Sequence, residues 1–119
     1  MATQNLTNEN FDEALKNNNI VILDFFAPWC PHCRQFGPVF EKSSEKHPEV
    51  LFGMVNVEQE TELKSRFGVG GIPTIIAFRE GTMVYSQPGA LTEDKLDNLV
   101  KKISEADMEE VRKEADRAE

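Results

Sequence analysis

Two cysteines, three positions apart in the motif Cys30-Pro31-His32-Cys33, are the residues best suited to covalent chemistry in this chain. Pro31 fits the first turn of a helix, where its missing N–H costs no hydrogen bond. Cys30 then lies at the helix N-terminus, where unpaired backbone N–H groups and the helix dipole favour its thiolate. Because a thiolate is the nucleophile of thiol–disulfide exchange, we expect Cys30 to be the attacking group.

Cys33 lies one helical turn further on, at the start of the apolar face of the same helix. A separation of three residues brings both sulfur atoms to one side of the turn and within reach of a disulfide bond. We therefore expect an exposed Cys30 that attacks and a sheltered Cys33 that stays a neutral thiol until it resolves the mixed disulfide.

Other uses of the cysteine pair fit the sequence less well. A structural zinc site needs four ligands, usually from a second Cys or His pair, and the chain adds only His32 and His47. A c-type haem needs a His directly after the second cysteine, where Arg34 stands. We predict no metal site, and two inert thiols are the remaining alternative.

Asp24 interrupts an apolar run, Ile20 to Phe26, that is typical of a strand buried on both faces. A buried carboxylate costs free energy unless it is paired or functional, and burial raises its pKa. A carboxyl group whose pKa lies near neutrality suits a proton acceptor. The alternative is an aspartate at the end of the strand that faces water.

The elements that position these groups follow from hydrophobic periodicity and chain-breaking residues. Strands are expected before Thr7 and over residues 20–26, 50–57, 74–78 and 83–86; helices are expected over about residues 8–17, 31–47 and 60–67, and from Thr92 onward. The early alternation predicts a right-handed parallel unit, and the final hairpin makes the sheet mixed. The fold class is therefore α/β, with a central mixed sheet of four to five strands flanked by helices on both faces.

Two prolines and the C-terminal segment qualify this pattern. Pro38 lies inside the second helix and should kink it. Pro73 precedes a strand and either begins it or holds a cis bond, cis being the minority choice on physical grounds alone. We expect a domain over residues 1–103, and residues 104–119 to extend the last helix as a charged, solvated and partly frayed extension.

Composition narrows the class of protein. A chain of 119 residues fits one domain, and its net charge of −8 disfavours nucleic acid and anionic membrane surfaces as partners. No apolar run approaches the about 18 residues that span a bilayer. The N-terminus lacks a basic region followed by an apolar stretch, so we expect no secretory signal, a cytoplasmic location and a monomer. A mature chain whose signal peptide was removed and replaced by a start methionine would show the same N-terminal sequence.

Together these motifs resemble the thioredoxin family. The stretch from Phe25 to Cys30, followed by Cys33, is similar to the family's active-site strand and loop. Asp24 matches its buried aspartate, Pro38 its helix-kinking proline, and the Gly-Ile-Pro-Thr segment at 71–74 its cis-proline loop. Gly81 and the pair Gly89-Ala90 also stand at family positions, and the similarity covers about residues 3–103.

The resemblance implies a thiol–disulfide oxidoreductase of the thioredoxin type that cycles between a Cys30–Cys33 disulfide and the dithiol, through a mixed disulfide on Cys30. No cofactor beyond this redox-active disulfide is implied. Asp24 would help to move the proton of Cys33. A cis Pro73 would lie near the sulfur atoms, and the backbone of Ile72 would pair with an extended substrate segment.

The resemblance also implies a docking surface and partners. The apolar rim that contacts substrate would comprise Trp29, Ile72, Pro73, Gly89 and Ala90. The partners would be disulfide-containing proteins and a thioredoxin reductase or similar electron donor, which implies roles in electron transport and cell redox homeostasis.

Four positions depart from the family pattern. Pro31-His32 stands where Gly-Pro is usual and resembles the periplasmic disulfide oxidant instead. Met54 aligns with the lysine that usually accompanies the buried aspartate. Without that positive charge, the carboxyl group of Asp24 should be harder to ionise. Phe26 replaces a common tryptophan, and Gly70 replaces a commonly larger residue beside the cis-proline loop.

The Pro-His pair leaves the direction of the reaction open. A His32 ring near the Cys30 sulfur favours the thiolate, and a more stable reduced form makes a stronger oxidant. We expect a potential between the about −270 mV of thioredoxin and the about −120 mV of the periplasmic oxidant. A reductase, an isomerase or oxidase, and a thioredoxin-like binding module without redox activity are therefore the competing functions.

Overall fold

The computed structural model describes residues 2–118, with side chains to residue 113. Five strands, which form one sheet, and five helices follow each other along this part of the chain. Their bounds are β1 Thr3–Asn5, α1 Phe11–Asn17, β2 Ile20–Phe26, α2 Pro31–Lys46, β3 Val50–Asn56, α3 Thr61–Arg66, β4 Thr74–Arg79, β5 Thr82–Pro88, α4 Glu93–Glu105 and α5 Met108–Ala118. None of the helices in this part of the chain combines the length and apolar character that a membrane crossing requires.

The sheet has the strand order β1-β3-β2-β4-β5, with β2 at its centre. Strands β1, β3 and β2 are parallel, whereas β4 runs antiparallel to β2, and β5 antiparallel to β4. The register pairs Phe25, near the end of β2, with Thr74, the first residue of β4. The cysteine motif follows β2, and Pro73 precedes β4. Both therefore lie at the same end of these two central strands.

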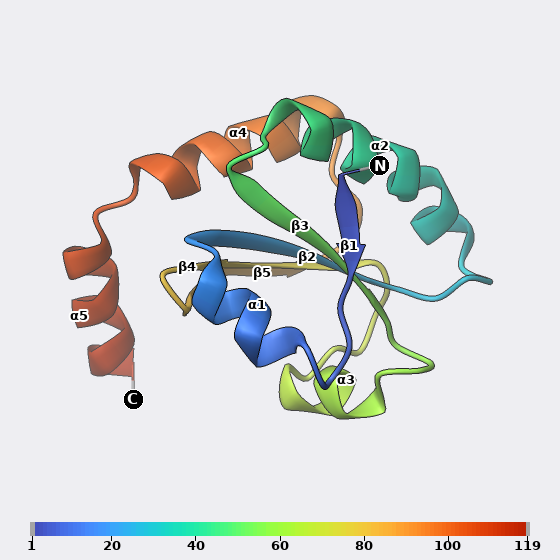
Figure 1. The fold of residues 1–119 in the computed structure, drawn as a ribbon, viewed down its shortest axis with the longest axis horizontal. Coiled ribbons are helices and arrows are strands. Elements are labelled where there is room, and N and C mark those ends of the chain that lie inside the picture. The colour runs from blue at the N-terminus through green and yellow to red at the C-terminus, as the bar shows by residue number, and fades with distance from the viewer. Residues whose placement is uncertain (1, 119) are drawn as a thin grey trace.

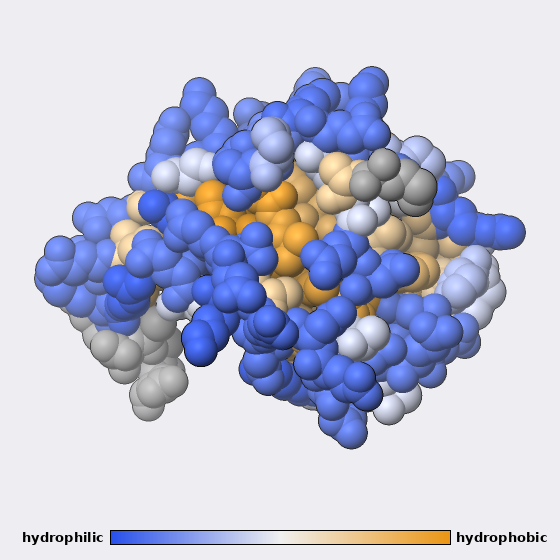
Figure 2. Space-filling model, in the orientation of Figure 1, coloured by the Kyte–Doolittle hydropathy of each residue, from blue (hydrophilic) through white to orange (hydrophobic). Residues whose placement is uncertain are grey.

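Helices cover both faces of the sheet, as expected: α2 and α4 lie on one face and α1 and α3 on the other (Figure 1). Alternation along β2 divides its side chains between two buried clusters. Val21, Leu23 and Phe25 pack with Phe11 of α1, while Ile20 and Ile22 pack with residues of α2 and α4. Figure 2 shows apolar side chains gathered over β3, between the α2–α4 layer and α1, within an otherwise mostly polar view.

The expected order of strands and helices is confirmed, and Pro38 lies inside α2. The expectation that residues 104–119 simply continue the last helix is wrong. Helix α4 ends at Glu105, Ala106 is extended with ψ 139°, and α5 begins at Met108. The physical reason is a new N-cap, because the Asp107 carboxylate accepts hydrogen bonds from the backbone N–H groups of Glu109 and Glu110.

Arg79, at the end of β4, holds this break in place. Its guanidinium Nη1 donates to the carbonyl oxygens of Ile103 at 2.7 Å, Ser104 at 3.1 Å and Ala106 at 2.7 Å. Arg112 of α5 in turn donates to the neighbouring Glu80 at 2.8 Å. The β4–β5 turn therefore binds the end of α4 and the first turns of α5 by charge-assisted hydrogen bonds.

Replacing Arg79 by Met should destabilise the fold by about 2 kcal/mol, because the carbonyl oxygens at the end of α4 lose a charged donor. The free energy of unfolding in urea, followed by circular dichroism, measures this loss. Arg34→Met, at an exposed helical position, is the matched control and should change it by less than about 0.5 kcal/mol. Equal effects of the two substitutions would show that the Arg79 contacts contribute nothing to stability.

Candidate active site

Cys30 is the N-cap residue of α2, in an extended conformation with φ −79° and ψ 117°, and Pro31 is the first helical residue. The backbone N–H of Cys33 donates to the Cys30 sulfur at 3.3 Å. This contact satisfies one of the N–H groups that a helix start leaves unpaired. It also places a hydrogen-bond donor where it stabilises negative charge on the Cys30 sulfur.

The expected contrast in exposure between the two cysteines is wrong. Cys30 and Cys33 are each only 4% exposed, and both are free thiols. Cys30 is covered because the loop before β4 folds over it: its Sγ lies 3.9 Å from the carbonyl oxygen of Ile72. The exposed part of the motif is instead the intervening pair, Pro31 and His32.

Cys33 is as buried as Cys30, and its pKa is strongly raised. Burial is the largest effect that raises the pKa of Cys33, which reaches about 12. The hydrogen bond with Cys30 and the negative charges of Cys30 and Asp24 raise it further, against a backbone hydrogen bond at Ala27. Cys33 therefore stays protonated at neutral pH until a nearby group accepts its proton.

Asp24 lies in β2, the central strand of the sheet. It is 0% exposed, and neither carboxylate oxygen has a hydrogen-bond partner among the described residues. Burial raises its pKa from 3.8 to about 7. The alternative of a strand-end aspartate facing water is thereby excluded. A buried carboxyl group that ionises near pH 7, close enough to Cys33 to influence its pKa, suits a proton acceptor.

The neighbours of Asp24 across the sheet are apolar. In register it stands between Met54 of β3 and Ile75 of β4. In-register residues of adjacent strands share a face, so no positive charge is offered from the position of Met54. The sequence expectation that Met54 stands beside the buried carboxyl group is confirmed, and burial acts on its pKa without a compensating cation.

The residues expected to form a docking rim lie together around Cys30. The Ile72–Pro73 peptide bond is cis. The N–H of Gly89 donates to the Pro73 carbonyl at 2.7 Å, which joins the segment after β5 to this loop. Gly89 has φ +100°, a conformation that favours glycine. Ala90 follows and is exposed, so the rim combines three separate stretches of chain.

Trp29 is the most exposed large apolar side chain of the rim, at 62%. Its indole Nε1 donates to the carboxylate of Glu58 at 2.8 Å. Glu58 follows β3 and had not been singled out from the sequence, because no local pattern links positions 29 residues apart. It fixes the ring beside the cysteine motif and adds a negative charge to the rim.

Other candidate groups lie away from the cysteines. His47 is at the far end of α2, where its Nε2 lies 3.1 Å from Asp97 of α4. Among the described residues, no cluster of three or more His, Cys, Asp or Glu side chains is arranged to hold a metal ion.

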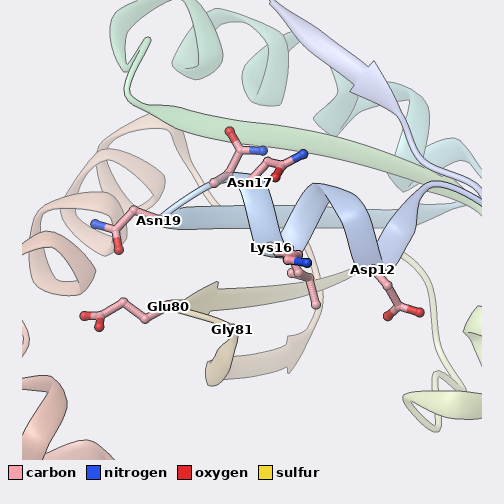
Figure 3. A pocket seen from close by; sticks show the side chains of 8 residues that line it. Asp12, Lys16, Asn17, Asn19, Glu80 and Gly81 are labelled. Atoms are coloured by element: carbon pink, nitrogen blue, oxygen red, sulfur yellow. The ribbon is translucent and has the colours of Figure 1, made fainter.

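A hollow of about 650 Å³ opens between the end of α1 and the β4–β5 turn (Figure 3). It adjoins Asn19, which precedes β2, whereas the cysteines follow β2. The hollow is therefore one strand length, roughly 20 Å, from the cysteine motif. Its walls mix Asp12, Lys16 and Glu80 with asparagines, so no single class of ligand is favoured.

Comparison with known proteins gives consistent results. The family model described as Thioredoxin matches residues 2–102. A Streptomyces coelicolor protein named "Putative thioredoxin 2" is 46% identical over 112 residues, which cover 94% of this chain and 84% of that protein. Protein disulfide-isomerase A4 from Rattus norvegicus is 40% identical over 83 residues, which cover 66% of this chain and 13% of that protein.

A solved structure supports the same assignment. A mutant thioredoxin from Halobacterium salinarum NRC-1 has a TM-score of 0.81 and 28% sequence identity, covering 88% of this chain and 92% of that one. The five-stranded mixed sheet flanked by helices is therefore the thioredoxin fold that the sequence motifs implied.

The raised pKa of Asp24 predicts how stability depends on pH. Between pH 3.8 and about 7 the folded chain keeps a proton that the unfolded chain has lost. For this group, the free energy of unfolding is therefore highest at low pH, falls through that window and levels off above it, with a total cost of about 4 kcal/mol. Asp24→Asn should remove this decrease and be more stable than the parent at pH 8, but not at pH 4.

Urea denaturation of both chains from pH 4 to pH 8 measures the difference. Asp94→Asn, an exposed aspartate in the first turn of α4, is the control and should keep the pH dependence of the parent. If Asp24→Asn and its parent show parallel pH profiles, the carboxyl group does not titrate near neutrality.

Proposed function

Because the chain belongs to the thioredoxin family, we propose that it reduces or forms protein disulfides by cycling Cys30 and Cys33 between dithiol and disulfide. The observation that carries the proposal is the contact of the Cys33 N–H with the Cys30 sulfur at the start of α2. It supports a thiolate on one cysteine, while the pKa of about 12 keeps the other protonated.

The first step is attack on a substrate disulfide. The Cys30 thiolate displaces one substrate sulfur, a new bond joins Cys30 to the other, and the displaced sulfur leaves as a thiolate. The N–H of Cys33, 3.3 Å from the Cys30 sulfur, holds the nucleophile at the helix end. The nearby Ile72 carbonyl marks the side on which substrate backbone would bind by strand-like pairing.

The second step resolves the mixed disulfide. Asp24 takes the proton of Cys33, and the Cys33 thiolate attacks the Cys30 sulfur. The substrate leaves with its second sulfur as a thiolate. The substrate disulfide has then been reduced by two electrons, and the cysteine pair has been oxidised to the Cys30–Cys33 disulfide. The pKa of about 7 lets Asp24 accept this proton at neutral pH.

The proposed partners follow from this cycle. Disulfide-containing proteins would dock on the rim formed by Trp29, Ile72, Pro73, Gly89 and Ala90. A dithiol donor such as a thioredoxin reductase would return the Cys30–Cys33 disulfide to the dithiol. The expected cytoplasmic location and monomeric state stay predictions.

A second candidate, an isomerase- or oxidase-like function, is favoured by the pair between the cysteines. His32 is exposed on the first turn of α2, next to the sulfur-binding helix end. When protonated it would stabilise the Cys30 thiolate and so the reduced form. The similarity to a region of protein disulfide-isomerase A4 is consistent with a reduction potential above that of thioredoxin.

Replacing either cysteine should separate the two chemical steps. Cys30→Ser should abolish reduction of insulin disulfides by dithiothreitol, a loss of at least about 1,000-fold in rate, because the nucleophile is gone. Cys33→Ser should still attack and should accumulate a mixed disulfide that mass spectrometry detects. A redox-inactive binding module would behave identically with and without these substitutions, and that result would contradict the proposal.

Exchanging Pro31-His32 for Gly-Pro should lower the reduction potential toward the about −270 mV of thioredoxin, because the reduced form loses stabilisation. Equilibration in glutathione buffers, with alkylation of the free thiols, measures the potential of each chain. Gln35→Ala, exposed one turn along α2, is the control and should leave the potential within about 10 mV. A parent potential already near −270 mV would remove the case for an isomerase or oxidase.

A further inference from the structure

A second concave surface lies along β5 and α4. Two hollows of about 370 and 490 Å³ adjoin there, since both are lined by Tyr85, Leu99 and Lys102. We refer to them together as the β5–α4 groove. Its further lining residues are Met83, Val84, Leu91, Lys95, Asn98, Ile103, Ala106 and Val111.

The groove is mainly apolar and exposed. Met83 is 42% exposed and, with Trp29, is one of two exposed large hydrophobic residues in the described part of the chain. Tyr85 and Leu99 are half-buried against the core beneath. Apolar surface that forms a concave patch with a polar border is typical of sites where other proteins bind.

The charge of the groove is opposite to that of the protein. Its only charged lining residues are Lys95 and Lys102, whereas the whole chain carries a net charge of −8. Within residues 2–113, neither lysine forms an ion pair. Two free ammonium groups beside an apolar surface complement a ligand that has both apolar and acidic side chains.

Backbone groups are available beside these side chains. Strand β5 is at the end of the described sheet and pairs only with β4. Its outer N–H and C=O groups can accept a further strand, as edge strands do. Pro88, which has no N–H, marks one end of that edge.

We propose that the β5–α4 groove binds an extended segment of a partner protein in which apolar and acidic side chains alternate. The segment pairs with the free edge of β5, its apolar side chains cover Tyr85 and Leu99, and its carboxylates meet Lys95 and Lys102. The groove begins at Leu91, directly after the rim residue Ala90, so one partner can contact both surfaces. Because neither cysteine lines the groove, this binding is independent of the proposed redox function.

The test uses a fluorescein-labelled peptide, Glu-Val-Glu-Leu-Asp-Val-Glu, and fluorescence anisotropy with the full chain. Lys95→Glu with Lys102→Glu should weaken binding by about tenfold or more, which corresponds to about 1.4 kcal/mol or more, because both favourable charge contacts are reversed. Lys101→Glu reverses an exposed charge on the same helix that does not line the groove, and should change Kd by less than about twofold. The Cys30→Ser chain should bind like the parent, so a failed redox proposal would not affect this result.

Four further measurements test where the peptide binds, which charges it needs and whether the variants are folded. Backbone amide shifts on peptide addition should concentrate in residues 82–88 and 91–103. A peptide with Lys in place of every acidic residue should not bind. Circular dichroism and insulin reduction should show that each lysine variant is folded. Equal affinity for parent and double variant, shifts elsewhere, or a dimer of the free chain that the same variants dissociate would each overturn the proposal.

Discussion

The antiparallel pairing of β2 with β4 is the constraint on which the site depends. It places the end of β2 beside the start of β4, its neighbour in the sheet, with Phe25 opposite Thr74. The loop that carries Cys30 and the loop that carries Pro73 therefore meet, although Cys30 and Ile72 are 42 positions apart in the chain. The 3.9 Å contact between Cys30 and Ile72 is a direct result of that register. A one-residue slip would turn Asp24 to the other face and separate it from the cysteines.

The electrostatics of the site depend on the same burial. Asp24 and Cys33 are two acids in a region of low dielectric constant: burial raises the pKa of both, and the charge of Asp24 raises the pKa of Cys33 further. Cys33 therefore stays protonated at pH 7, where Asp24 is about half ionised, and transfer of the Cys33 proton to the Asp24 carboxylate leaves one negative charge in the core and not two. The backbone N–H of Cys33 donates to the Cys30 sulfur at the start of α2, where the helix dipole favours negative charge.

Patterns that are local in sequence predicted much of this structure. Apolar runs, chain-breaking residues and the three-residue spacing of the cysteines are properties of short segments, and they indicated the strands, the start of α2 and the burial of Asp24. The burial of Cys30 was missed because it depends on a carbonyl 42 positions away. The contact of Trp29 with Glu58, and the break at Ala106 fixed by Arg79, also depend on side chains from distant segments. No periodicity within one helix or strand contains that information.

The position of Trp29 has a consequence for spectroscopy. It is the only tryptophan in the chain, it adjoins Cys30, and its indole N–H is bonded to Glu58. Thiols and disulfides close to an excited indole quench its emission to different degrees. The tryptophan emission of this protein therefore comes from a single ring next to Cys30, so a change in the oxidation state of the cysteine pair can be followed in real time without an added dye.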